Sequence, residues 1–365
     1  MPELREMSKW KQSVKIRIQG VAASPAAMNT LSFPHPEPPR EQMRLLPVFL
    51  PFAGCPDGRC IFCNQPAQTG LGAVPLQRAW DDLRNMLDKQ DKPCGIGFFG
   101  GTFTGLAPHL QEKFLVLTDK YRKKGIVSHV RLSTRPDKIS SASAVWLKEQ
   151  GVDMVEFGIQ TFSTPVLRFS GRGYDAKRAR NACHIAREAG LDFGIQLLPG
   201  LPGHDTELWQ EDILQTIKLR PGVVRIYPCL VLRETELARR YMAGLFQPWS
   251  LEQAVERAGQ ALLQFWQAKI RVIRLGLLGD LQDILVAGPW HPAFGTMARS
   301  MALFFLLRQH VEVRAKKVLA LHVPQRFSGE IFGVGGANKK KLATLGVTAE
   351  RIFWTQGEQF VLEEE

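Results

Sequence analysis

The sequence lacks any long uninterrupted apolar run. A membrane-spanning helix needs about 20 consecutive apolar residues, and no stretch of the 365 residues reaches that length. The first 20 residues, MPELREMSKWKQSVKIRIQG, also lack the continuous apolar segment of a signal peptide. We therefore expect a protein with no membrane partner and a cytoplasmic location, where thiols stay reduced.

Cysteine is scarce and unevenly placed. The six cysteines are Cys55, Cys60, Cys63, Cys94, Cys183 and Cys229, and only the first three form a cluster, spaced C-x4-C-x2-C. A secreted disulfide scaffold would be shorter and richer in cysteine, so metal or redox chemistry is the better interpretation. The cluster has no fourth cysteine nearby.

Three neighbouring thiolates without a fourth ligand suit one kind of metal centre better than another. A structural zinc site takes four protein ligands, whereas iron–sulfur clusters are held by thiolates in closely spaced runs. A four-iron cluster on three cysteines keeps one iron open to an outside ligand. We expect Cys55, Cys60 and Cys63 to bind such a cluster, and a zinc site is the alternative.

Acidic residues are in deficit. The chain has 47 Lys and Arg against 35 Asp and Glu, which gives a net charge of +12 and a pI near 9.6. Residues 299–341 carry nine basic residues against two acidic ones, or +7. This balance favours an anionic partner, nucleic acid above all. Within that stretch, GVGGAN followed by three lysines suits either a phosphate cradle or an ordinary capped helix.

The apolar pattern divides the chain into three parts. Residues 1–44 are rich in proline and polar residues, which predicts a mobile leader. In residues 45–279, short apolar runs alternate with longer amphipathic stretches, which indicates six βα units and a parallel sheet. Six units suit an incomplete barrel or a doubly wound sheet. Residues 280–365 lose this rhythm and predict a small basic α/β accessory module.

The predicted strands end in unusual polar, Gly and Pro residues. Because active sites of parallel barrels lie at the carboxyl ends of the strands, we expect the site there. The six ends carry the cysteine loop, Gly100-Gly101-Thr102, Thr134-Arg135-Pro136-Asp137, Gln160-Thr161, Pro199-Gly200 and Tyr227-Pro228-Cys229.

Several of these segments resemble one enzyme family. Cys60-Ile61-Phe62-Cys63 is similar to the C-x-aromatic-C of radical S-adenosylmethionine (SAM) enzymes, although most of that family has three residues, not four, between the first two cysteines. FFGGTFTGL resembles the family's Gly-Gly-Glu motif, with Thr102 in place of the acid. The segments TRPD, GIQTF, GRGYD, LLPGLPG and YPCLVLRETEL resemble the Elp3-type tRNA-modifying proteins and, more weakly, oxygen-independent coproporphyrinogen dehydrogenases.

The resemblance implies a fold, two cofactors and a set of contacts. The fold would be a partial (β/α)6 barrel of the TIM type, and the cofactors a [4Fe–4S] cluster and SAM, with an electron donor such as a flavodoxin or ferredoxin. SAM would be cleaved reductively to methionine and a 5′-deoxyadenosyl radical that abstracts a substrate hydrogen. The implied SAM contacts are Gly100 and Gly101 (backbone), Thr102 and Gln160 (methionine or ribose), Arg135 and Arg172 (carboxylate), and Ile195 and Pro199 (adenine).

Charge and resemblance together favour an RNA substrate, tRNA-like in kind. The Elp3-type acetyltransferase chemistry is not expected, because this chain ends soon after the predicted barrel. One alternative is a small-molecule oxidoreductase of the coproporphyrinogen dehydrogenase type. An alternative of another class is an RNA-binding protein whose metal site is structural.

Overall fold

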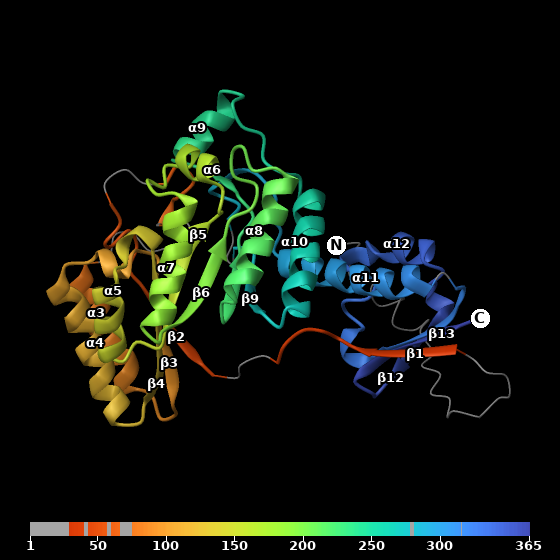
Figure 1. Cartoon of the computed structure of the whole chain (residues 1–365), viewed down its shortest axis with the longest axis horizontal. Helices are drawn as coiled ribbons and strands as arrows, with labels where there is room; N and C mark the ends of the chain where they lie inside the picture. Colours follow the sequence, from red (N-terminus) through yellow and green to blue (C-terminus); the bar gives the residue numbers. More distant parts are fainter. Residues whose placement is uncertain (1–28, 40–42, 57–59, 66–74, 278–280, 315) are drawn as a thin grey trace.

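The computed structural model describes residues 29–39, 43–56, 60–65, 75–277, 281–314 and 316–365. Figure 1 shows two lobes side by side, a larger one built on a curved parallel sheet and a smaller one near the carboxyl end of the chain. Helices α10 and α11 lie where the lobes meet. No helix among the described residues is long and apolar enough to cross a membrane.

The larger lobe is built on seven parallel strands. In spatial order they are β2 (Leu45–Phe49), β3 (Cys94–Phe99), β4 (Val127–Thr134), β5 (Met154–Gln160), β6 (Asp192–Leu197), β7 (Val223–Ile226) and β9 (Arg271–Leu275). Spatial order follows chain order without reversal. The sheet therefore has no switch point of the doubly wound kind, and the prediction of a partial TIM-type barrel is confirmed.

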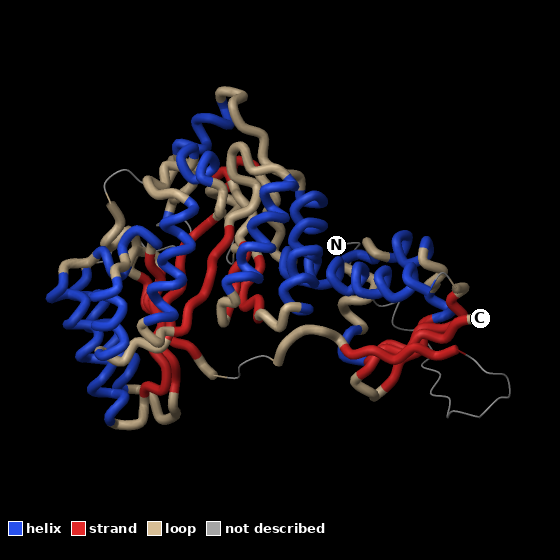
Figure 2. Tube along the Cα trace, viewed as in Figure 1, coloured by secondary structure: helices blue, strands red, loops and turns tan. Residues whose placement is uncertain are grey.

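Helices follow the strands, and most of them cover the outer face of the sheet, as Figure 2 shows. They are α3 (Leu76–Asp88), α4 (Pro108–Lys123), α5 (Ser141–Glu149), α6 (Thr164–Phe169), α7 (Ala176–Glu188), α8 (Thr206–Leu219), α9 (Glu236–Met242) and α10 (Leu251–Gln267). The short helices α6 and α9 lie instead beyond the ends of the strands. Side-chain caps fix several helix starts, since Ser140, Asp175, Asp205 and Ser250 each accept a hydrogen bond from a backbone N–H of the first turn.

The smaller lobe is a four-stranded sheet against one long helix. Its strand order is β1 (Asn29–Pro34), β13 (Gln359–Glu364), β11 (Val318–Pro324) and β12 (Ile352–Thr355). Helices α11 (Phe294–Arg314) and α12 (Lys339–Thr344) belong to the same lobe. Strands β1 and β11 both pair antiparallel with β13, and β12 pairs parallel with β11. The α/β character predicted for this region is present.

The predicted leader needs a correction. Residues 29–34 form β1, the edge strand of the small sheet, far along the chain from its partner β13. Phe33 is buried there and stacks on His310 and Phe360. The proline-rich composition around it concealed a strand whose burial depends on residues more than 300 positions away. Residues 1–28 and 40–42 of the predicted leader lie outside the described residues.

The predicted boundary at residues 279 and 280 also moves. Strand β10 (Leu285–Ala287) pairs with β8 (Val231–Leu232) of the barrel lobe, so residues just beyond 280 still belong to that lobe. The carboxyl-terminal part of the small lobe begins with α11. Its core continues into α10, because Leu262 and Trp266 pack in one cluster with Leu303 and Leu321. The two lobes therefore share a hydrophobic core.

His35 follows β1 and closes one side of this shared core. Its ring stacks on Phe327 at 4.6 Å and meets Trp266 edge-on at 4.8 Å. The Glu37 backbone N–H donates to Nδ1 at 3.3 Å, while Nε2 is buried without a hydrogen bond. Burial, reinforced by the charges of Arg299 and Arg326 and opposed by Glu37, lowers the pKa of His35 from 6.5 to about 4. The folded protein therefore keeps this imidazole neutral.

This burial predicts an acid-sensitive fold. Because the folded pKa of His35 lies below the unfolded one, its contribution to stability is complete above pH 6.5 and is lost as pH falls toward 4. His35→Phe should keep the ring contacts and flatten the decline in urea midpoint between pH 6.5 and 4, whereas replacing exposed His109 by Gln should not. An equal decline in wild type and His35→Phe would contradict this prediction.

Candidate functional site

A cavity of about 840 Å³ opens at the carboxyl ends of the strands. This volume lies within the range of about 300–1,000 Å³ typical of small-molecule sites. All three clustered cysteines line it, and so do most of the polar residues that were predicted from the strand ends. Five arginines and no carboxylate are among its described lining residues; the arginines are Arg131, Arg135, Arg172, Arg225 and Arg274.

The cysteine loop is anchored to the rest of the barrel lobe by its own backbone. The N–H of Ile61 donates to the carbonyl of Ser170 at 3.3 Å, and the carbonyl of Ile61 accepts from Leu237 N–H at 2.8 Å. The Ile61 side chain is buried in an apolar cluster with Val166 of α6. These contacts hold Cys60 and Cys63 at the cavity between α6 and α9.

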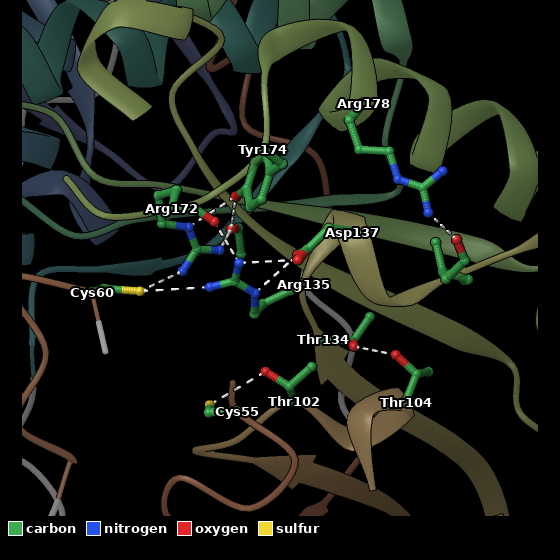
Figure 3. Close-up of polar contacts among 12 residues, drawn as sticks. Cys55, Cys60, Thr102, Thr104, Thr134, Arg135, Asp137, Arg172, Tyr174 and Arg178 are labelled. Carbon is green, nitrogen blue, oxygen red and sulfur yellow. Dashed lines mark hydrogen bonds and ion pairs between the residues drawn. The ribbon is translucent and has the colours of Figure 1, made fainter. Parts of the chain in front are cut away.

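Two arginines face the sulfur of Cys60, as Figure 3 shows. Arg172 Nη1 lies 3.0 Å from Cys60 Sγ, and Arg135 Nη1 lies 3.9 Å from it. Arg135 also forms a bidentate pair with Asp137, at 2.9 and 3.1 Å. Arg172 instead donates to the Gly158 carbonyl at 2.5 Å and to Tyr174 Oη at 3.0 Å. Within the described part of the chain, no carboxylate pairs with Arg172.

A cationic guanidinium lies beside the Cys60 sulfur. Burial alone would disfavour the charged form of Arg172, yet the neighbouring Tyr174 and Cys60 raise the pKa of its guanidinium above the ordinary value. Conversely, burial and then the nearby Cys60 and Cys55 raise the pKa of Cys63 to about 12. Three thiolates this close repel one another, so their joint ionisation requires a cation between them.

The donor set fits an iron–sulfur cluster better than a single ion. Among the described residues, no three His, Cys, Asp or Glu side chains are placed to share one metal ion. A four-iron cluster takes each thiolate on a different iron, so its ligands need not converge on one point. Cys55, Cys60 and Cys63 would hold such a group at the cavity.

The Gly100-Gly101-Thr102 turn supports the cysteine loop. Gly100 has φ 91°, a left-handed conformation that favours glycine. A Cβ on Gly101 would meet the backbone oxygen of Ala53 and lie 2.6 Å from that of Leu50. Thr102 Oγ1 lies 3.3 Å from Cys55 Sγ. These residues line the cavity, and their own contacts shape the loop.

Gln160 ends β5 in an unusual backbone conformation. It is a buried non-glycine residue with φ 73°, beside a register shift between Gly158 and Gln160. Such conformations cost about 1–3 kcal/mol and collect at functional sites. Its Oε1 accepts a hydrogen bond from Gln196 Nε2 at 3.3 Å, and both side chains line the cavity.

Two predicted contacts do not reach the cavity. Ile195 is buried in the main core, and the cavity is lined by the next residue, Gln196, because successive strand residues point to opposite faces. Pro199 is also outside the lining, and its carbonyl accepts from Cys229 N–H at 2.8 Å. Leu198 lines the cavity in its place. The described lining at β6 and the turn after it is therefore formed by the neighbours of the two predicted residues.

A second arginine group within the barrel was missed. Arg131 of β4 and Arg225 of β7 flank the carboxylate of Glu156 on β5, with nitrogen–oxygen distances of 3.3 and 2.5 Å. All three side chains are at most 15% exposed. The sequence did contain a signal for this group, because each of these charged residues lies within an apolar, strand-like run. A charged residue in a buried parallel strand needs an interior partner or a ligand.

The basic stretch 299–341 carries less free charge than its composition indicates. Arg299 is held between Glu37 and Glu330, and Arg314 and Lys317 pair with Glu364 and Glu365. Asn338, expected in a phosphate cradle, is buried and donates to the Ser300 carbonyl at 2.9 Å. Of the aromatics in this part of the chain, Phe327 is core and Phe353 is 44% exposed.

Comparisons with known proteins agree with this site. A model of the radical SAM superfamily matches residues 49–215, and a model of the radical SAM C-terminal domain matches residues 221–302. A tRNA uridine(34) acetyltransferase of Methanocaldococcus jannaschii is 25% identical over 264 residues, covering 60% of this chain and 49% of that protein. Mouse elongator complex protein 3 is 26% identical over 197 residues, covering 48% and 36%.

A third curated relative is the oxygen-independent coproporphyrinogen-III oxidase-like protein HemZ of Bacillus subtilis, 26% identical over 206 residues, covering 53% of this chain and 40% of that protein. The chain thus spans about half or less of these relatives. The structure of Methanocaldococcus infernus Elp3 with an N-terminal deletion superposes with a TM-score of 0.58 at 20% identity, covering 73% of this chain and 64% of that one. Together the two family models cover the cysteine loop, six of the seven strands and the last residue of β2, and the chain belongs to the radical SAM superfamily of enzymes.

Proposed function

We propose that this protein binds a [4Fe–4S] cluster through Cys55, Cys60 and Cys63, cleaves SAM reductively, and abstracts a hydrogen atom from an RNA substrate. Family membership implies the cluster and SAM. When bound, the reduced cluster supplies the electron that splits SAM into methionine and a 5′-deoxyadenosyl radical. The remaining work of binding, orientation and exclusion of water falls to the residues of the cavity.

The observation that carries this proposal is the setting of the Cys60 sulfur. It lies at the wall of a large cavity, 3.0 Å from an arginine that has no carboxylate partner among the described residues. A structural zinc site is closed by four protein ligands, whereas these three cysteines line an accessible space. A metal site that serves only the fold has no need of such a cavity.

Different polar residues around the cysteine loop can contact different parts of the SAM molecule. Arg172 can neutralise the carboxylate of the methionine part, because its guanidinium already faces the cysteines. Gln160 and Gln196 form a paired amide edge suited to the hydroxyls of a ribose. Thr102 has a neutral hydroxyl where the family motif carries an acid, and this hydroxyl already contacts Cys55. Its contact with an ammonium is therefore weaker than a carboxylate's.

An RNA substrate is supported by charge and by the relatives. The chain has a net charge of +12, and the described lining of the cavity contains no carboxylate. Relatives over half or more of this chain include tRNA uridine(34) acetyltransferases. The lysines of α12 remain the best candidates for phosphate contacts in the small lobe, since the buried arginine of that lobe is already paired. A flavodoxin- or ferredoxin-like donor in the cytoplasm would supply the electron.

The cysteine assignment predicts that replacing a clustered cysteine and replacing a core cysteine have different effects. Cys55→Ala, Cys60→Ala and Cys63→Ala should each abolish the broad visible absorption of the anaerobically reconstituted protein and the reductant-dependent formation of 5′-deoxyadenosine. Cys94→Ala and Cys183→Ala should retain both, because these thiols are buried in the core. Stoichiometric zinc in place of iron after anaerobic purification would refute the cluster.

Gly101 offers a test of the loop itself. Gly101→Ala should lower the iron content and SAM binding together, because the added Cβ meets the backbone of residues 50–53 rather than a flexible side chain. Gly329→Ala is the control, since a Cβ there meets nothing within 4 Å. Full iron content with selective loss of SAM binding would show that Gly101 contacts the cofactor and does not support the loop.

The lysines of α12 provide the test of RNA binding. Neutralising Lys339, Lys340 and Lys341 to Gln should weaken RNA binding and reduce the slope of log affinity against log salt by about 0.7–0.9 for each phosphate that is no longer neutralised. SAM cleavage without RNA should stay unchanged. Neutralising the exposed Lys89, Lys92 and Lys124 removes the same charge from the barrel lobe as a control. Salt-independent or undiminished RNA binding in the first variant would favour a small-molecule substrate.

A further inference from the structure

The interior of the barrel carries a second group of charges, away from the cysteines. Arg131 lies on β4 and Arg135 directly follows that strand, four residues on, and both line the cavity. At about 3.3 Å per residue, their backbones are about 13 Å apart along the strand direction. Arg135 belongs to the cysteine end. Arg131 belongs to the floor, which we define as Arg131, Arg225, Arg274 and the Phe99 ring.

The floor is built by side chains from four strands. Phe99 of β3 folds its ring against Gly97, where any Cβ would collide with that ring. The guanidinium of Arg225 lies 4.9 Å from the centre of this ring, and that of Arg131 lies 5.6 Å from it. Arg225 Nη1 also donates to Tyr227 Oη at 3.2 Å. Packing therefore holds both guanidinium groups in position, so they lose less side-chain entropy when they bind a ligand.

The charges of the floor do not balance. Glu156 is nearly fully buried and pairs with both Arg131 and Arg225, so one carboxylate serves two guanidinium groups. Arg274 lies beside Arg225 in the register of β7 and β9 and also lines the cavity. It has no hydrogen bond or ion pair within the residues that the structure describes. Among the residues that the structure describes, the floor thus combines three guanidinium groups with one carboxylate, and Arg274 is the guanidinium that this carboxylate does not pair with.

A purely structural role does not explain this surplus. Buried ion pairs are costly unless each charge is matched, and apolar side chains usually fill the interior of a parallel barrel. An unmatched guanidinium beside two others destabilises the empty protein through like-charge repulsion. A ligand that carries negative charge removes this penalty, and planar guanidinium groups bind carboxylate and phosphate oxygens through paired hydrogen bonds.

We infer that the floor is an oxyanion subsite, in which Arg274 and Arg225 hold a carboxylate or phosphate group of the substrate while Glu156 positions Arg225. The assignment of this anion to a substrate rests on the proposed function. The subsite fixes one end of the substrate within the cavity, so the carbon that loses hydrogen lies between an anionic group and the cofactors. The same charges disfavour a cationic small molecule at this position.

The test is direct binding of two small anions to the full-length, cluster-loaded protein without SAM or reductant. Inorganic phosphate and acetate are titrated separately by calorimetry at constant ionic strength. Wild type should bind one anion per chain, and Arg274→Gln should raise its dissociation constant by at least about tenfold. The dissociation constant of Arg274→Lys should lie between those of wild type and Arg274→Gln. Tighter phosphate than acetate identifies a phosphorylated substrate group, and the reverse identifies a carboxylate.

Two controls separate this subsite from anion binding at the basic surface and from a loss of folding. Lys340→Gln removes one exposed charge and should leave the dissociation constant unchanged, unless phosphate binds the basic surface. Arg274→Gln should not lower the thermal midpoint of the anion-free protein, because it relieves repulsion. Arg225→Gln should lower that midpoint, because it removes a partner of buried Glu156. A lowered midpoint in Arg274→Gln together with unchanged anion binding would overturn the subsite.

The experiments can refute the subsite and the proposed function independently of each other. Anion binding that depends on Arg274 in a protein that forms no 5′-deoxyadenosine would refute the radical chemistry and leave the subsite intact. Normal 5′-deoxyadenosine formation with equal anion affinity in wild type and Arg274→Gln would refute the subsite alone.

Discussion

The contact between Cys60 Sγ and the Arg172 guanidinium joins two loops that lie more than 100 residues apart in the chain. Arg172 reaches this sulfur because its own position is fixed by Tyr174 and by the Gly158 carbonyl at the end of β5. The cysteine loop is thereby coupled to the strand that also presents Gln160. The proposed metal ligands and the polar edge formed by Gln160 thus depend on one set of hydrogen bonds.

The position of the small lobe depends on helix α10, which contributes side chains to the cores of both lobes. One face of α10 packs on the barrel, where Ala261 and Phe265 join the main core, and another packs on α11, where Leu262 and Trp266 join the second core. Strand β1 adds Phe33 to that second core. A segment before the first barrel strand and a segment after the last one therefore meet in one sheet. This arrangement fixes the small lobe against the barrel through apolar contact.

The sequence predicted the parts of the fold that local pattern determines. The succession of βα units and the gathering of the strand ends followed from periodicity and from the geometry of parallel sheets. Strand β1 did not, because its burial comes from β13, which the pattern near residue 30 cannot reveal. Ile195 was expected at the site from the family resemblance, whereas the structure places its side chain in the core and that of Gln196 in the cavity lining, because successive strand residues point to opposite faces.

The arginines of the barrel interior could be noticed in the sequence, but their arrangement could not be predicted from it. Arg131, Arg225 and Arg274 stand in the middle of strand-like runs, so each was visible as an anomaly in the sequence. That two of them converge on one carboxylate, and that Arg274 is left over, depends on the register of four strands and cannot be read from any one of them.

The two ends of the cavity have a common electrostatic character. At the cysteine end, Arg172 offsets the negative charge of thiolates, and within the barrel three arginines exceed one glutamate. Low-dielectric walls lined by one sign of charge raise the local concentration of ligands of the opposite sign. SAM carries a sulfonium cation, so its positive sulfur is best accommodated near the anionic thiolates and away from the arginine floor. For the proposed ligands, this charge distribution would place SAM at the cysteines and the anionic part of the substrate at the arginine floor.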